Sequence, residues 1–303
     1  MQANSSKRRV VVTGYGMVTP LGKDAEETFA RASLGESGID YIRSFDTTGL
    51  PCRIGGEVDD ACLGGFAESS AGRLEKFASR GLKLMATATR EATGQAKLET
   101  IQNRETIGVS LGSHGENAPL DQVLYLHRFY DGNGGWDVTG LMRAGGYSYL
   151  SFFRCKPDVA MALLANLFDC RGSHLSIVSA CAAGAQAIGE AVHLIREGRA
   201  NVMIAGGCEA TLDFLGFVGF VLIKALAERY TDPQTASRPF DRKRSGFVMS
   251  EGAGAIVLEA LEHAQARGVP ILGELLGYGD SADAYRITDT HPQGEGAVLA
   301  MRR

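Results

Sequence analysis

The sequence predicts an α/β protein in which helices cover a sheet of short, buried strands. Short runs of apolar and β-branched residues alternate along the chain with longer stretches of helical periodicity. Glycines bound most of the apolar runs, and the chain has 39 glycines in 303 residues without a collagen-like repeat. We therefore expect many tight turns and close backbone approaches.

Five short apolar runs are the predicted strands. Glycines such as Gly14, Gly112 and Gly254 flank them, and this punctuation favours strands over fragments of buried helix. Strands that are apolar on both faces are typical of a sheet covered on both sides. In chain order the predicted strands are residues 10–14, 107–112, 175–180, 202–205 and 253–260.

Four stretches between these strands have helical periodicity. They are residues 24–34, 74–97, 158–168 and 182–197. The last carries Ala183, Ala187 and Ala191 at helical spacing and is so rich in small residues that we expect it to be buried. Residues 114–153 mix glycines with aromatic residues, which predicts an excursion over the surface or an entrance rather than a domain linker.

The charge and the apolar segments argue against two classes of partner. A formal net charge of -4 provides no basic field for nucleic acid or an anionic membrane. The longest apolar run, residues 214–223, is too short to span a bilayer and fits a buried element. The N-terminus leads into the first strand without an apolar leader, so we expect a cytoplasmic location and reduced thiols.

Cys181 is the strongest candidate for a catalytic residue. It lies where the predicted strand 175–180 meets the helix 182–197, and a thiolate there faces the free N–H groups of the helix start, which lower the pKa of a thiol. A buried, structural cysteine is the alternative interpretation. The other cysteines lack this setting and are interpreted as structural; they are Cys52, Cys62, Cys155, Cys170 and Cys208.

Three other sequence patterns are weaker evidence for a functional site than the setting of Cys181. The segment Gly14-Tyr15-Gly16 lacks the third glycine of a dinucleotide-binding fingerprint, so a strand followed by a turn is the favoured interpretation. The six histidines are scattered along the sequence. Each is expected to lie at the surface or to have its hydrogen bonds satisfied within the protein, rather than to bind a metal. An ion pair between Arg238 and Asp241 is predicted to lock the turn that contains them.

Five ordered blocks of sequence together resemble one family. They are residues 9–22, 179–184 (Ser-Ala-Cys-Ala-Ala-Gly), 205–209, 236–241 and 246–254. The blocks are similar to those of the β-ketoacyl-[acyl-carrier-protein] synthases of type II fatty-acid synthesis, and the similarity continues through residues 276–285 and 294–301. Because the blocks occur in order over nearly the whole chain, the resemblance is specific.

The resemblance implies a thiolase-like fold of αβαβα layers, usually assembled as a homodimer. Residues 1–260 would be the N-terminal half that carries the nucleophile, and residues 261–303 would begin the C-terminal half. The family's two catalytic histidines and its lysine belong to that second half, and their motifs do not occur here. The chain is therefore expected to be truncated.

The resemblance also implies the chemistry. Cys181 would accept an acyl group as a thioester before decarboxylative Claisen condensation with a malonyl thioester, and its own N–H would donate to the oxyanion. No cofactor is implied, because the substrates travel on the phosphopantetheine of acyl carrier protein. Phe220, Lys224 and Thr288 match positions at the substrate entrance, where Lys224 replaces an arginine.

The sequence departs from the family's pattern at two places. Residues 113–117 (Ser-His-Gly-Glu-Asn) replace a glycine-rich gate, which implies a more polar or roomier acyl pocket, and Arg286 stands where a histidine is usual.

One alternative function is that of a non-catalytic partner subunit like a chain-length factor, but such subunits lack the cysteine. The other is a dinucleotide-binding oxidoreductase, which rests only on the Gly14-Tyr15-Gly16 segment.

Overall fold

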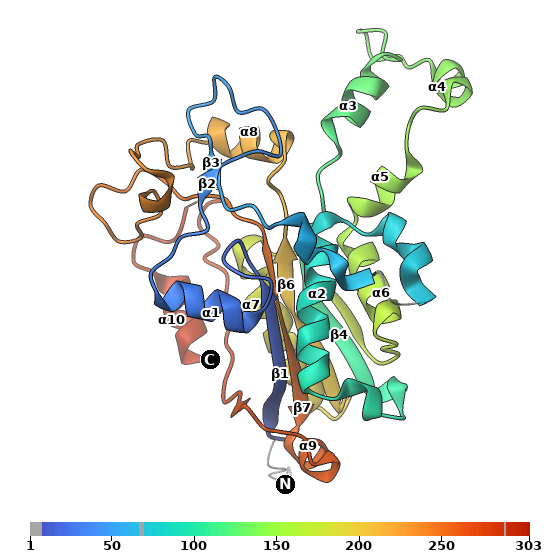
Figure 1. Cartoon of the computed structure of the whole chain (residues 1–303), viewed down its shortest axis with the longest axis vertical. Helices are drawn as coiled ribbons and strands as arrows, with labels where there is room; N and C mark the ends of the chain where they lie inside the picture. The colour runs from blue at the N-terminus through green and yellow to red at the C-terminus, as the bar shows by residue number, and fades with distance from the viewer. Residues whose placement is uncertain (1–7, 67–69, 288) are drawn as a thin grey trace.

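A six-stranded mixed sheet forms the centre of the computed structural model, which describes residues 8–66, 70–287 and 289–303 (Figure 1). The strand order is β5-β4-β6-β7-β1-β8. β4 is parallel to β5 and β6, whereas β7 runs antiparallel to β6 and β1, and β8 is antiparallel to β1. The strands are β1 (Val10–Val18), β4 (Ile107–Gly112), β5 (His174–Ile177), β6 (Val202–Glu209), β7 (Gly252–Ala260) and β8 (Gly273–Glu274).

All five predicted strands are confirmed, although the bounds of all but β4 differ from the prediction. β6 continues to Glu209 because it pairs with β7 over its whole length. β5 ends at Ile177, three residues before the predicted end, because the chain leaves the sheet there. A small separate sheet pairs β2 (Asp40–Tyr41) with β3 (Ile54–Gly55).

The turn predicted after Gly14 is wrong, because β1 continues straight through Gly14 and Gly16 to Val18. The pairing of β1 with β7 has an irregularity between Val12 and Gly14 but then runs on to Val18. A Cβ atom on Gly16 would lie 2.2 Å from the carbonyl oxygen of Ala88. The glycines therefore let a helix lie directly on the strand.

The four predicted helices are confirmed as α1 (Ala25–Ser33), α2 (Arg80–Gln95), α6 (Pro157–Leu167) and α7 (Ala183–Arg196). α2 begins later than predicted because Ser79 caps it, and a 3-10 helix spans Ser70–Phe77. The further helices are α3 (Leu120–His127), α4 (Val138–Ala144), α5 (Tyr149–Arg154), α8 (Phe214–Leu222), α9 (Leu261–Arg267) and α10 (Glu295–Arg302). Within the described ranges, no helix has both the length and the apolar character needed to cross a bilayer.

Helices pack on both faces of the sheet. α2 and α6 cover one face, where Leu82, Leu164 and Ile204 belong to the same buried cluster. α7 covers the other face and buries Ala191 and Ile195 against β6 and β7. The prediction that this helix is buried holds for that side only, because Ala185 and the preceding N-cap residue Ala182 are exposed. The predicted α/β class is confirmed.

Residues 114–153 form the predicted surface excursion. Figure 1 shows α3 and α4 projecting away from the sheet. Neither helix buries any of its residues, all of which are described. The apolar run predicted to be a buried element forms α8 and its C-terminal cap, where Phe217 is buried but Leu222 and Ile223 are exposed, so that prediction is only partly right.

The predicted ion pair between Arg238 and Asp241 is wrong among the residues described. The turn is closed by a backbone hydrogen bond, in which the Asp241 N–H donates to the Arg238 carbonyl at 3.2 Å. The Arg238 guanidinium donates to the carbonyl of Arg229 at 3.3 Å. Asp241 accepts a hydrogen bond from the N–H of Lys243, two residues on, at 2.6 Å.

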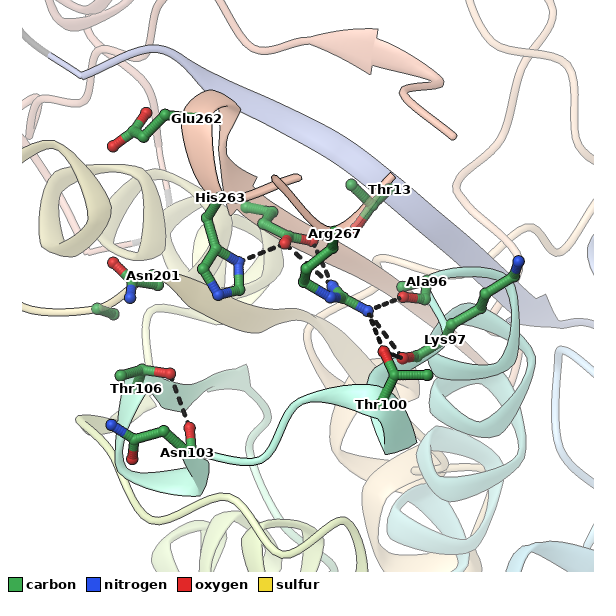
Figure 2. Close-up of polar contacts among 12 residues, drawn as sticks. Thr13, Ala96, Lys97, Thr100, Asn103, Thr106, Asn201, Glu262, His263 and Arg267 are labelled. Carbon is green, nitrogen blue, oxygen red and sulfur yellow. Dashed lines mark hydrogen bonds and ion pairs between the residues drawn. The ribbon is translucent and has the colours of Figure 1, made fainter. Parts of the chain in front are cut away.

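Polar contacts link one end of the sheet to the helices around it, and Figure 2 shows Arg267 of α9 pointing toward Ala96 and Thr100. Glu259 is fully buried, and Arg267 of α9 donates to both of its oxygens at 3.0 and 2.9 Å. His263 and Thr13 are its other partners. Arg267 also donates to the carbonyl of Ala96 at 2.7 Å, so it links β7 to the end of α2.

Replacing Arg267 with alanine should lower the free energy of unfolding by about 3 kcal/mol, because the buried carboxylate of Glu259 loses its guanidinium partner. A urea titration measures this value. Arg286→Ala is the control, because Arg286 pairs with Asp289 at an exposed position and should cost under about 1 kcal/mol. Equal effects of the two substitutions would contradict the role assigned to Arg267.

Candidate active site

Cys181 lies at the junction between β5 and α7, as predicted. The chain leaves β5 at Ile177, turns sharply at Ala180 with a φ of 47°, and forms a 3-10 turn over Ala180–Ala182 before α7 begins. A positive φ is unusual for a residue with a side chain and marks a constrained turn. Cys181 is exposed, and no side chain among the described residues caps α7. The thiol therefore stands at an open helix start.

Small residues bring this helix start close to the sheet. A Cβ atom on Gly112, the last residue of β4, would lie 2.4 Å from the carbonyl carbon of Ala183. A Cβ atom on Gly207 of β6 would lie 3.1 Å from the Cα atom of Gly184. Larger residues at these positions would push α7 away from the sheet. The glycines thus fix where Cys181 sits.

Cys181 opens into a cavity of about 860 Å³. Its wall comes from the end of β1, the carboxyl ends of β4 and β6, the first half of β7, and the start of α7. Nearly half of the lining residues are glycine or alanine, among them Gly184, Gly206, Gly254, Ala205 and Ala255. Because these side chains take up little volume, the space beside the thiol is large enough for a bound substrate.

Polar side chains gather in one part of this cavity. Ser113 and His114 follow β4, Glu209 ends β6, and Asn117 and Thr211 follow them. They meet because β4 and β6 are parallel neighbours, whose carboxyl ends lie at the same edge of the sheet. Burial raises the pKa of Glu209, while hydrogen bonding from the Ala210 N–H and the proximity of His114 oppose this rise.

The other five thiols are held in less reactive settings. Burial raises the pKa of Cys208, which also lies in the cavity wall, to about 12. Burial likewise raises the pKa of Cys170 to about 12. The pKa values of Cys52, Cys62 and Cys155 are also raised, in each case chiefly by burial. A thiol with a raised pKa holds its proton at neutral pH and is a poor nucleophile.

Of the two predicted entrance residues that the structure describes, one lines the cavity. Phe220 lines it and packs edge-to-face against Phe247, with ring centroids 5.5 Å apart. Lys224 is exposed just after α8 with a φ of 58°, and it is not among the described residues that line the cavity. Thr288 lies outside the described residues. Arg286 is exposed and pairs with Asp289 at 3.1 Å.

His114 and Glu209 are cavity residues that the pattern of residue types did not single out. The available sequence signal for His114 is its place two residues after the predicted strand 107–112. The implied polar pocket at residues 113–117 does have three of its members in the wall, Ser113, His114 and Asn117. In the part of the chain described, no group of three or more His, Cys, Asp and Glu side chains could hold a metal ion.

Comparison with known families identifies the fold and the family. Residues 7–264 match the family described as β-ketoacyl synthase, N-terminal domain. This match covers most of the chain, so the protein belongs to the β-ketoacyl synthase family. The resemblance seen in the sequence blocks is thereby confirmed.

Individual relatives agree with this assignment. The chain is 37% identical over 314 residues to 3-oxoacyl-[acyl-carrier-protein] synthase 2 of Synechocystis, covering 99% of this chain and 69% of the relative. A crystal structure of a β-ketoacyl synthase from Burkholderia phymatum superposes with a TM-score of 0.79 at 28% identity, covering 97% of this chain and 70% of that one. A ketosynthase of type II polyketide synthesis, solved with its acyl-carrier protein and bound to a hexaketide, superposes with a TM-score of 0.74 at 26% identity, covering 98% of this chain and 70% of that one. The predicted thiolase-like α/β fold is confirmed.

Proposed function

We propose that the protein is a 3-oxoacyl-[acyl-carrier-protein] synthase of fatty-acid or polyketide biosynthesis, with Cys181 as its acyl-accepting nucleophile. The observation that carries the proposal is the exposed thiol at the start of α7, open to a cavity of about 860 Å³. The other thiols lack this combination, because their pKa values are raised by burial. The family assignment supports the same chemistry.

In the proposed first step, the Cys181 thiolate attacks the carbonyl carbon of an acyl thioester. A bond forms between the cysteine sulfur and the acyl carbon, and the developing oxyanion accepts a hydrogen bond from the Cys181 N–H. Collapse of the intermediate expels the carrier thiolate, which takes a proton. The acyl group is then held in the cavity lined by small residues and Phe220.

In the proposed second step, malonyl-carrier protein loses carbon dioxide and its enolate attacks the acyl-Cys181 thioester. The resemblance assigns the stabilisation of this enolate to histidines and a lysine whose motifs do not occur in residues 1–303. This step forms the new carbon–carbon bond and regenerates the Cys181 thiolate. We propose acyl carrier protein as the partner that delivers both substrates, with Phe220 and Lys224 at the entrance, in a cytoplasmic reaction that needs no cofactor. The solved polyketide ketosynthase that binds its acyl-carrier protein supports this partnership.

A non-catalytic subunit like a chain-length factor is the alternative function. The exposed Cys181 disfavours it, because a subunit that only shapes a pocket has no use for a reactive thiol at a helix start. Acylation of Cys181 by a substrate separates the two functions.

We propose that two copies of the chain form a homodimer through β5. β5 is an edge strand that pairs with β4 on one side. The carbonyl oxygens of Ser173 and Ile177 face β4, because they accept hydrogen bonds from the N–H groups of Val109 and Ser113. Successive residues of a strand direct their backbone N–H and C=O groups to opposite sides. The backbone groups of His174 and Ser176 therefore point away from β4. An edge of this kind pairs with a second copy of itself.

Cys181→Ala should abolish acylation of the protein by an acyl thioester, measured as the mass added to the intact chain and located by peptide mapping. Cerulenin, an epoxide that alkylates nucleophilic cysteines, should label the parent protein and not this variant. Cys155→Ala is the matched control and should be acylated like the parent. Acylation of Cys181→Ala to the same extent as the parent would rule out the assigned nucleophile.

Ser176→Pro should convert the dimer to a monomer, because proline removes an N–H group from the free edge of β5. Sedimentation velocity measures the oligomeric state. His174→Ala keeps the backbone donor and should remain dimeric. A Ser176→Pro protein that is folded by circular dichroism and still dimeric would place the interface elsewhere.

A further inference from the structure

Three side chains with the chemistry of a catalytic triad share one cavity. Cys181, His114 and Glu209 all line the space of about 860 Å³ beside the start of α7. In a triad of a thiol, an imidazole and a carboxylate, the imidazole moves a proton and the carboxylate orients the imidazole. The condensation proposed above gives no role to His114 or Glu209. A second reaction is therefore open to them.

The ends of two neighbouring strands bring the imidazole and the carboxylate to the start of α7. A Cβ atom on Gly112 would lie 2.4 Å from the carbonyl carbon of Ala183, so the end of β4 meets the first residue of α7. His114 follows Gly112 by two residues, and consecutive Cα atoms are about 3.8 Å apart, so its Cα atom lies within about 8 Å of this contact. Glu209 follows Gly207, which pairs with Gly112 in the sheet, by the same two residues. Both side chains therefore start from the same end of the sheet as the contact with α7.

The turn that carries His114 is fixed by contacts on both sides of it. Ser113 is buried, and its hydroxyl accepts a hydrogen bond from the N–H of Gly115 at 3.1 Å. Gly115 has a φ of 89°, and a Cβ atom there would lie 2.6 Å from the carbonyl oxygen of Cys155. His114 itself is exposed. The backbone of this turn is therefore held in place while water can reach the imidazole.

Glu209 is close enough to His114 for their charges to interact. Burial raises the pKa of Glu209, and the nearby His114 works against this rise. A carboxylate beside an imidazole orients the ring and stabilises its protonated form. Glu209 is thus placed to act through His114, as the third member of the set.

We propose that His114 and Glu209 give the protein a second activity, the hydrolysis of the acyl group carried by Cys181. This proposal rests on the proposed function, because the acyl group must first be transferred to Cys181. His114 takes a proton from a water molecule, whose oxygen forms a bond to the acyl carbon. The bond between that carbon and the cysteine sulfur then breaks, and the proton passes from His114 to the departing thiolate. The products are a free carboxylic acid and the free thiol. The protein thereby acts as a thioesterase toward an acyl chain that is not extended.

The test follows the loss of an octanoyl group from protein that has already been acylated. Cys181 is loaded with S-octanoyl-N-acetylcysteamine, the excess thioester is removed, and mass spectrometry follows the acylated chain and the octanoic acid released. His114→Gln should accept the octanoyl group at the parent rate but lose it about a hundredfold more slowly, because it lacks the base. His127→Gln is the matched control, since His127 is an exposed histidine of α3 that is not among the described residues lining the cavity. It should lose the group as fast as the parent.

Two further substitutions separate a catalytic role from a structural one. Free imidazole should restore deacylation to His114→Gly, because the exposed position leaves room for a small base to enter. Glu209→Gln should slow deacylation, and Glu209→Asp, which keeps the carboxylate, should retain more of the parent rate. Equal deacylation rates in the parent, His114→Gln and Glu209→Gln would overturn the hydrolytic role and leave the proposed function standing. Failure of the parent to accept any acyl group on Cys181 would overturn both.

Discussion

The close approach of α7 to the ends of β4 and β6 is the constraint on which the site depends. Gly112 and Gly207 end or nearly end their strands, and neither has a Cβ atom to hold the helix away. The chain reaches this position through a sharp turn with a positive φ at Ala180. Cys181 follows that turn directly, so the packing of the helix and the placement of the thiol have one cause.

The same small residues also explain why a cavity lies beside the thiol. A wall of glycine and alanine leaves space where larger side chains would fill the end of the sheet. The remaining cysteines are buried or half-buried, whereas Cys181 is exposed. Cys170 and Cys208 are buried, and burial raises the pKa of each to about 12. The fold therefore places the six thiols in unequal settings, with Cys181 exposed and the others buried or half-buried.

The sequence predicts much of this structure wherever the signal is local. Buried strands and small-residue helices have recognisable runs, and the position of Cys181 between a strand and a helix was visible in the chain itself. Features that depend on distant partners could not be predicted. The continuation of β1 past Gly16 requires pairing with β7, and the hydrogen bond that Asn117 donates requires Asp213, 96 residues further on.

The most direct test of the account is the alkylation rate of each cysteine by iodoacetamide, followed by peptide mapping between about pH 7 and pH 9. Cys181 is predicted to react first across this range, because it is exposed at a helix start while the pKa values of the others are raised. Cys170 and Cys208 should stay unmodified in the folded protein. Faster alkylation of Cys62 or Cys155 than of Cys181 would contradict the assignment of the nucleophile.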